Sequence, residues 1–528
     1  MMEITGSMLI GAVSTQGKSE EFRAFSPALN VEIDPVFGSG GVGDVDRACK
    51  LAAEAFPIYR ATTPHQRAHF LETIARRIEE LGDSLIERAA LETALPTARL
   101  EGERGRTTGQ LRHFACVVRM GHWLGATLDS PLPERTPLPR PDLRKSHVAL
   151  GPVAVFGASN FPLAFSVAGG DTAAALAAGC PVVVKAHGAH PGTSELVGRA
   201  VQAAVAECGL PEGTFSLIQG VGNAVGETLV DHPAIRAVGF TGSRAGGLAL
   251  SRRAAARDVP IPVYAEMSSI NPVVLLPRAL SARAESIGQA FADSLTLGVG
   301  QFCTNPGIVI AIEGPELDHF VDATAQSLRN KVAGVMLTPG IAAAYAAGVK
   351  LLAEHERVET IAIGQATSAG CGARAHFFAT DAASFLGHAE LRDEIFGPSS
   401  MLVRCRNVDE MMDLLGRLEG QLTATLQMDS GDVPLARRLL PLLEDKVGRI
   451  LVNGFPTGVE VSHAMVHGGP FPATTDSRST SVGSAAIDRF LRPVCYQNFP
   501  VDLLPAALAD VNVLAIPRVV DGNVVLPN

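Results

Sequence analysis

The chain has 528 residues, of which 47% are hydrophobic and 19% are charged, and its formal net charge at pH 7 is −10. A chain of this length exceeds what one hydrophobic core supports, so we expect two or three domains. An acidic chain without a long basic run gives no electrostatic footprint for nucleic acid, so we expect no nucleic-acid partner.

The N-terminus and the cysteines favour a cytoplasmic protein. The first residues, MMEITGSMLIGAVS, carry an early Glu3 and no basic region, unlike a secretory signal peptide. No apolar run reaches about 18 residues without interruption, so we expect no membrane span. The eight cysteines are scattered without a C-x-x-C pair, which argues against a zinc site or a disulfide framework.

The first 150 residues predict only two helices. We expect irregular structure over residues 1–30. Residues 62–92 predict one helix, because a capping box and a first-turn proline (TPHQ) precede apolar residues at helical spacing. A second helix is expected over about 108–120. The proline-rich segment 131–141 predicts an extended seam between two units.

From the seam onward, strand and helix patterns alternate. Short apolar strands are expected at 152–156, 181–186, 215–219, 235–240 and 261–265, with helices at 163–178, 193–208, 223–230 and 244–257. Such alternation predicts a parallel sheet covered on both faces, with ligands beyond the carboxyl ends of its strands.

The same α/β texture continues over about 279–485 and predicts a second domain. Its strands are expected at 308–312, 360–364, 400–404 and 449–453. The tail after Arg492 contains strand-like runs at 511–516 and 524–526 that can pair with another chain.

Three of the expected strand ends carry residues suited to a cofactor or an oxyanion. Asn160, in FGASNFP, can donate its amide to a developing oxyanion or cap the next helix. Lys185, with His187 close behind, can reach a cofactor's ribose or phosphate or lie on the surface. Gly242 and Ser243, in GFTGSRAGG, suit a pyrophosphate at a helix N-terminus or a simple tight turn.

An acid and a thiol complete the set of candidate residues. Glu266 ends the fifth strand, where it is either a general base or a paired, buried carboxylate. Cys303 lies in the glycine-rich loop GVGQFCTNPG. Only a few per cent of a free thiol with a pKa near ~8.5 is thiolate at neutral pH, but thiolate is a strong nucleophile. A single cysteine in such a loop is either a presented nucleophile or an ordinary core residue.

In their order along the chain, these motifs resemble the aldehyde dehydrogenase superfamily over about residues 25–490. The likeness rests on SNFP, FTGS, the strand-end glutamate, GQFCTNP and EIFGP. VKAHGAHPGTSE and HGGPFPATTDSRSTSVG are similar to the bacterial branch that holds α-ketoglutaric semialdehyde dehydrogenase and an NADP-dependent fatty aldehyde dehydrogenase.

The resemblance implies an α/β fold of three parts that assembles as a homodimer or homotetramer. A Rossmann-like cofactor domain would comprise residues 1–125 and 148–277. An α/β catalytic domain would comprise 278–485. A small β oligomerisation element would combine 126–147 with 486–528.

The resemblance also implies a mechanism without a metal. Cys303 would attack the aldehyde carbon, and the Asn160 amide would hold the oxyanion. Glu266 would activate the water that hydrolyses the thioester, and since acylating relatives commonly lack this glutamate, a free carboxylate is expected. His467 would either assist this chemistry or simply bond the backbone of its loop.

The implied cofactor site consists of Lys185, His187, Gly242, Ser243, Glu394 and Phe396. Gly188 stands where the NAD-preferring pattern has a glutamate for the 2′-hydroxyl. Because no acid repels a 2′-phosphate there, and Lys185 with His187 can accept one, we expect NADP, with NAD as the alternative.

The implied partner is a small aldehyde, in the main reading α-ketoglutaric semialdehyde (2,5-dioxopentanoate), oxidised to 2-oxoglutarate. Its carboxylate needs a basic group, for which Arg112 is the candidate. A medium- or long-chain fatty aldehyde is the alternative, with Phe161 and Phe165 along its path. A further alternative, of a different class, is a non-catalytic protein that keeps the fold for binding or structure.

Overall fold

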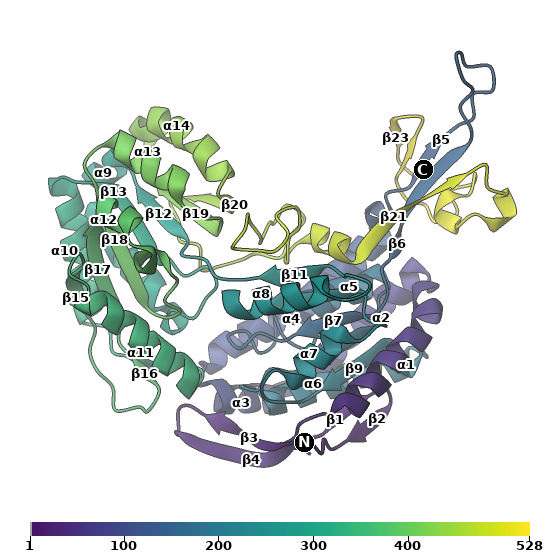
Figure 1. The fold of residues 1–528 in the computed structure, drawn as a ribbon, viewed down its shortest axis with the longest axis horizontal. Coiled ribbons are helices and arrows are strands. Elements are labelled where there is room, and N and C mark those ends of the chain that lie inside the picture. Colours follow the sequence, from purple (N-terminus) through teal and green to yellow (C-terminus); the bar gives the residue numbers. More distant parts are fainter. Residues whose placement is uncertain (1–2, 528) are drawn as a thin grey trace.

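The computed structural model describes residues 3–527. Two seven-stranded sheets, each packed among helices, stand side by side, and a five-stranded sheet projects away from them at the upper right of Figure 1. This is the α/β arrangement that the sequence predicts. Within the described residues, no helix is both long and apolar enough to cross a membrane.

The first seven-stranded sheet contains the five predicted parallel strands. In spatial order its strands are β11 (Val263–Glu266), β10 (Ala237–Thr241), β7 (Val153–Phe156), β8 (Val182–Lys185), β9 (Phe215–Ile218), β1 (Met8–Ile10) and β2 (Val13–Thr15). The strands from β11 to β9 are parallel, whereas β1 and β2 are antiparallel.

The expectation of irregular structure over residues 1–30 is wrong. Besides β1 and β2, residues 21–26 form β3, which pairs with β4 (Val31–Gly38) as a hairpin at the bottom of Figure 1. β1 has only three residues and pairs with β9, about 200 positions later. Three residues are too few to show a hydrophobic period. The strand is stabilised by pairing with a partner that is distant in the sequence.

Within the described residues eight helices accompany this sheet; α1 was not predicted, and three of the predicted helices differ from their expected bounds. The eight helices are α1 (Val42–Arg60), α2 (Pro64–Glu80), α3 (Gly82–Thr93), α4 (Thr97–Met120), α5 (Gly170–Ala178), α6 (Pro191–Glu207), α7 (Ala224–Asp231) and α8 (Arg244–Ala255). The helix expected over 62–92 is two helices, divided at Gly82, whose positive φ of 57° interrupts it. α4 begins eleven residues before the expected 108.

The third difference is the late start of α5. The helix expected from residue 163 begins only at Gly170, and a buried carboxylate from α4 contacts the loop that precedes it. Glu103 Oε1 accepts hydrogen bonds from the backbone N–H groups of Leu163 and Ala164 at 2.8 and 3.0 Å. These bonds fix the loop of residues 161–169 beside Asn160.

Two cores lie on opposite faces of the first sheet. Val153, Val155 and Val184 point into one core, whereas Ala154 and Val183 point into the other. This alternation along continuous apolar strands is what a sheet buried on both faces requires. The result is a rigid sheet whose strand ends position Lys185 and Glu266.

The second seven-stranded sheet also follows the predicted alternation. Its strands, in spatial order, are β15 (Glu359–Ile363), β17 (His376–Asp381), β18 (Ser399–Cys405), β13 (Ile308–Ile312), β12 (Pro272–Leu275), β19 (Gln421–Gln427) and β20 (Val447–Val452). The helices packed with it are α9 (Pro277–Thr296), α10 (Pro315–Arg329), α11 (Pro339–Glu354), α12 (Ala382–Gly387), α13 (Val408–Arg417) and α14 (Val433–Glu444). Between α10 and β17 in the sequence, β14 (Gly334–Val335) and β16 (Gly372–Ala373) pair as a separate two-stranded antiparallel sheet.

The five-stranded sheet joins the proline-rich seam to the tail. Its strands, in spatial order, are β21 (Leu491–Gln497), β6 (Leu143–Ala149), β5 (Thr127–Asp129), β22 (Arg518–Val520) and β23 (Asn523–Val525). The strand-like run at 511–516 is not a strand, because Asn512 ties it into a turn through its hydrogen bonds to Ile516. The domain limits given above stay a prediction.

Candidate active site

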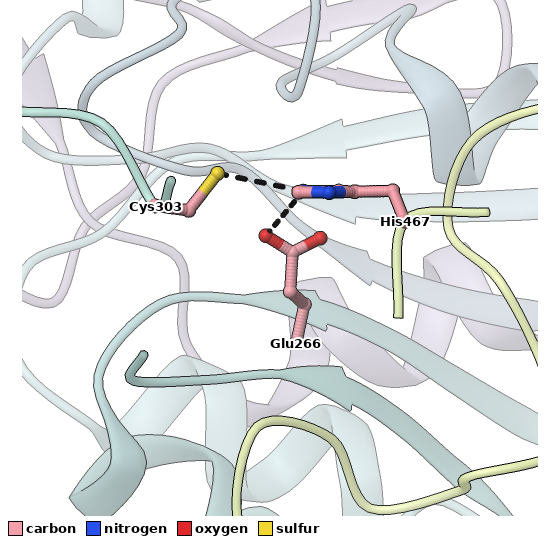
Figure 2. Close-up of side chains that lie close together, drawn as sticks. All are labelled: Glu266, Cys303 and His467. Atoms are coloured by element: carbon pink, nitrogen blue, oxygen red, sulfur yellow. Dashed lines mark hydrogen bonds and ion pairs between the residues drawn. The ribbon is translucent and has the colours of Figure 1, made fainter. Parts of the chain in front are cut away.

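Three side chains from distant parts of the chain meet at one point. Glu266 is the last residue of β11, Cys303 lies in the loop before β13, and His467 lies in the long loop after β20. Figure 2 shows the thiol and the carboxylate facing the same end of the imidazole: His467 Nε2 is 2.9 Å from Glu266 Oε1 and 3.4 Å from Cys303 Sγ. The three reactive atoms all lie within 4.8 Å of one another.

The loop that presents Cys303 is held from two sides. Asn271 Nδ2 donates to the carbonyls of Cys303 and Asn305, both at 2.9 Å. Gly300 has a φ of 63°, and a Cβ there would lie 2.4 Å from the backbone of Gly397. Only glycine fits this position, so the loop backbone and the thiol it carries have a fixed place.

Burial and charge set opposite protonation states for the thiol and the carboxylate. Burial raises the pKa of Cys303 well above its usual range, and the nearby charge of Glu266 raises it further. Burial also acts to raise the pKa of Glu266, but the attraction of His467 and hydrogen bonds from His467 and Ser481 outweigh it and leave that pKa lowered. At neutral pH the site therefore contains a thiol and an ionised carboxylate.

The hydrogen-bond pattern assigns the tautomer of His467. Its backbone N–H donates to Thr480 Oγ1 at 2.8 Å, which fixes the loop. Both polar neighbours of the ring lie at Nε2, whereas the buried Nδ1 has no hydrogen-bond partner within residues 3–527. A hydrogen on Nε2 donates to Glu266 and faces the sulfur, so His467 holds the carboxylate and can stabilise a thiolate.

Asn160 lies on the wall of the same site. It is buried, and its Nδ2 donates to the carbonyl of Gln301, two residues before Cys303, at 3.0 Å. Asn160 and Cys303 line one cavity of about 370 Å³. An amide nitrogen has two hydrogens, so Asn160 keeps one donor for an oxygen bound beside the sulfur. Helix capping, the alternative role, is not what this side chain does.

The predicted cofactor residues line two adjoining cavities. Lys185, His187, Gly242 and Ser243 line one of about 890 Å³ at the carboxyl ends of β8 and β10. Both cavities share Gly242 and Ser243, and the smaller one is also lined by Glu394, Phe396, Glu266 and Cys303. The two cavities therefore form one continuous space that leads from Lys185 to the thiol.

Local structure supports an anion at the junction of the two cavities. Ser243 is the N-cap of α8, and its Oγ accepts the N–H of Gly246 at 3.2 Å. The start of this helix opens onto the cavity, where its free N–H groups and dipole favour a pyrophosphate. The N-cap and the phosphate-binding role are thus compatible at this residue.

Burial shifts the pKa of three titratable residues that line the cofactor cavities. Burial lowers the pKa of Lys185 to about 8 and raises that of Glu394 to about 8. It also lowers the pKa of His187 to about 3, and His187 Nδ1 accepts the N–H of Ala189 at 3.1 Å. His187 is therefore neutral, and its part in accepting a 2′-phosphate stays a prediction.

A third cavity, of about 470 Å³, lies on the other side of Cys303. Phe161 and Phe165 line it, as the fatty-aldehyde alternative expects. Arg112 does not: it lies on the exposed side of α4 and pairs with Glu79 at 2.6 Å, so the expectation that it binds the substrate is wrong. The cavity instead contains Arg106, from the part of α4 that the sequence prediction missed, and Arg449, from β20.

Sequence reasoning missed Arg106 because the residues around it are mostly polar. Residues 97–107, TARLEGERGRT, have no apolar period, so they did not predict a helix. Glu103, Thr107 and Gln110 are nevertheless buried at helical spacing on one face. A row of polar side chains at that spacing indicates a helix face that borders a polar site.

Comparison with known proteins agrees with this geometry. The profile of the aldehyde dehydrogenase family matches residues 14–489. The chain is 62% identical over 523 residues to alpha-ketoglutaric semialdehyde dehydrogenase 2 of Azospirillum brasilense, covering 99% of this chain and 100% of the relative. It is 52% identical over 488 residues to an alpha-ketoglutaric semialdehyde dehydrogenase of Acinetobacter baylyi, covering 92% of each.

A solved structure shows the same fold. Aldehyde dehydrogenase C from Pseudomonas syringae, crystallised with NAD⁺ and octanal, superposes with a TM-score of 0.79 at 22% identity, covering 94% of this chain and 97% of that one. The chain thus belongs to the aldehyde dehydrogenase family. It is an oxidoreductase that uses a nicotinamide cofactor, so the alternative of a non-catalytic protein is not supported.

Proposed function

We propose that this enzyme oxidises α-ketoglutaric semialdehyde to 2-oxoglutarate, with NADP as the preferred cofactor. The observation that carries the substrate is the 62% identity, over 99% of the chain, to a protein of that named activity. The balanced reaction consumes the aldehyde, one NADP⁺ and one water, and yields the carboxylate, NADPH and two protons.

In the first step Cys303 attacks the aldehyde carbon. Because its pKa is raised, the thiol must lose its proton as the substrate binds. Glu266 is ionised and close enough to accept that proton, and the Nε2–H of His467 then faces the thiolate. The Asn160 amide and the Cys303 backbone N–H stabilise the oxyanion, a contribution typically of about 10²–10³ in rate per donor.

A bound nicotinamide supplies the hydride acceptor for this intermediate. The residues that would hold the dinucleotide are Lys185 at the adenine ribose, Ser243 at the pyrophosphate, and Glu394 with Phe396 at the nicotinamide ribose. Glu266 then releases the proton of the thiol to solvent, and the resulting thioester on Cys303 is hydrolysed by a water from which Glu266 removes a second proton. The new carboxylic acid returns a proton to the departing Cys303 thiolate. Buried and held by His467 and Ser481, Glu266 keeps the position that this step needs.

The choice of NADP rests on the loop after β8. Gly188 lines the adenosine end of the cavity, where an acidic side chain would repel a 2′-phosphate. Lys185 lies in the same cavity and can pair with that phosphate. NAD remains the alternative, because a missing acid removes a repulsion without excluding a 2′-hydroxyl.

A fatty aldehyde is the second candidate substrate, favoured by one observation. The rings of Phe161, Phe165 and Phe302 lie edge to face along the wall of the 470 Å³ cavity, with centroids 5.3 and 5.6 Å apart. The alkyl chain of a fatty aldehyde would pack against these rings, and so would the shorter carbon chain of an oxo acid.

The test is a comparison of kcat/KM for α-ketoglutaric semialdehyde and for octanal, each with NADP and NAD. We expect the highest value for the semialdehyde with NADP. Cys303→Ser is expected to abolish turnover while it retains cofactor binding, measured by fluorescence titration. A higher value for octanal would reject the proposed substrate.

A further inference from the structure

The cavity on the substrate side of Cys303 contains an arginine without a partner. The charged side chains that line this cavity are Arg106, Arg449 and Glu460. We propose that Arg106 binds a carboxylate at the end of the substrate remote from the aldehyde, and thereby selects aldehydes that are also carboxylic acids. This inference rests on the proposed function and names the group that recognises its substrate class.

The guanidinium of Arg106 has unused donors inside the protein. Its Nε and Nη2 are buried and have no hydrogen-bond partner within residues 3–527. A buried, unpaired guanidinium is unfavourable, and an anion bound to it restores the lost interactions. An arginine left in this state at the wall of a cavity therefore indicates a binding site for an anionic group.

The acid next to Arg106 on the same helix does not replace such an anion. Glu103 Oε1 is committed to the N–H groups of Leu163 and Ala164. Burial raises the pKa of Glu103 against the opposing effect of those hydrogen bonds and of the neighbouring arginines, which weakens it as a counter-charge. The positive charge of Arg106 thus remains available to a ligand.

Two aromatic rings fix the direction of this guanidinium. The Arg106 Cζ lies 5.0 Å from the centroid of Phe165 and 5.8 Å from that of Phe161. Cation–π contacts of this kind hold the planar group without using its N–H donors. The donors stay free for a two-point contact with a carboxylate, a geometry that suits arginine.

Arg449, the other arginine of the cavity, forms hydrogen bonds within the protein. Both terminal nitrogens of Arg449 donate to backbone carbonyls, Nη1 to Gly458 and Nη2 to Pro456, each at 2.7 Å. Arg449 therefore positions the loop that forms one wall of the cavity. Glu460, on the same loop, is exposed to solvent, so it does not neutralise Arg106 in the interior.

The experiment compares Arg106→Gln with Arg106→Lys on matched aldehydes. Glutaric semialdehyde and α-ketoglutaric semialdehyde carry the carboxylate, and pentanal has the same chain length without it. We expect Arg106→Gln to raise KM and lower kcat/KM for both acids by about 10- to 100-fold, the loss of a charge-assisted pair. We expect its kcat/KM for pentanal to stay within about twofold of the wild type, since no such pair is lost. Arg106→Lys should recover part of the loss.

A second readout uses a ligand that cannot react. Glutarate should inhibit pentanal oxidation competitively in the wild type and in Arg106→Lys, and much more weakly in Arg106→Gln. Arg112→Gln is the matched control, because Arg112 lies on the same helix in an exposed ion pair. It should leave the kinetics of all these aldehydes unchanged.

Two results would overturn the inference. One is unchanged kinetics of Arg106→Gln on the acids, and the other is an equal loss on pentanal and on the acids. The proposed function can fail separately: if the wild type oxidises glutaric semialdehyde in an Arg106-dependent manner but not α-ketoglutaric semialdehyde, the carboxylate site stands and the named substrate does not.

Discussion

At the scale of single residues, the site combines two requirements that conflict. The thiol must become a thiolate to attack, yet the ionised Glu266 within 4.8 Å favours the protonated thiol. The same carboxylate must stay ionised to accept a proton, and His467 with Ser481 keeps it so. The arrangement therefore holds Cys303 as an unreactive thiol until the aldehyde and the oxyanion donors are in place.

This conflict predicts an unusual effect of Glu266→Gln in the cofactor-free enzyme. Removing the negative charge lowers the pKa of Cys303, so its alkylation by iodoacetamide should become faster at pH 8, while turnover falls by about 10²–10⁴-fold, the range for loss of a general base. The measurement is the rate of modification of Cys303, followed by mass spectrometry from pH 6 to 10.

The sign of the pH dependence follows from the raised pKa. Wild-type alkylation should still be rising with pH at pH 9, the ordinary thiol value, and the Glu266→Gln curve should lie at lower pH. Ser481→Ala is the control, because it removes one hydrogen bond to Glu266 but keeps the charge. Equal alkylation rates in wild type and Glu266→Gln would refute this account of the site.

At the scale of elements, the sequence predicts the positions of the parallel strands, because each is a continuous apolar run. The strands β7, β8, β9, β10 and β11 are found where the pattern places them, so the side chains at their ends, such as Lys185 and Glu266, could be predicted as well. The helix starts could not. α5 begins late, after a loop that Glu103 contacts at Leu163, 60 residues further along the chain, and α4 begins early on polar residues whose burial depends on the site.

The loop after β8 gives a prediction on cofactor choice. A Cβ at Gly188 would meet only Val221 Cγ1, at an ordinary 3.7 Å, so Gly188→Glu is expected to fold normally. Its carboxylate would lie in the adenosine cavity and repel a 2′-phosphate. We expect kcat/KM with NADP to fall by about 10- to 100-fold, as like charges brought together in a binding site do.

The neutral variant separates charge from size in this loop. Gly188→Gln should change the NADP kinetics far less than Gly188→Glu, and NAD kinetics should be little affected by either. Steady-state assays with both cofactors measure these effects. If the wild type itself uses NAD more efficiently than NADP, the proposed preference is wrong, whatever the variants do.

At the scale of the whole molecule, the projecting sheet is the part that a single chain leaves incomplete. β21 and β23 are its edge strands, and within residues 3–527 each pairs with a single neighbour. Exposed apolar side chains gather on the tail that builds it: Leu503, Val511, Val513, Val524 and Leu526 are each at least 65% exposed. Open edges beside exposed apolar groups favour pairing with another chain.

We therefore propose that this sheet joins copies of the chain into a homodimer or homotetramer. Light scattering should give a mass that is two or four times 55.2 kDa for the wild type. The double variant Val524→Glu with Leu526→Glu should lower that mass, because it places charges on the apolar tail, whereas Leu351→Glu, at an exposed position on α11, should not. Since Cys303, Glu266 and His467 all come from one chain, the lighter species should still bind cofactor. A wild-type mass of 55.2 kDa at micromolar concentration would refute this assembly.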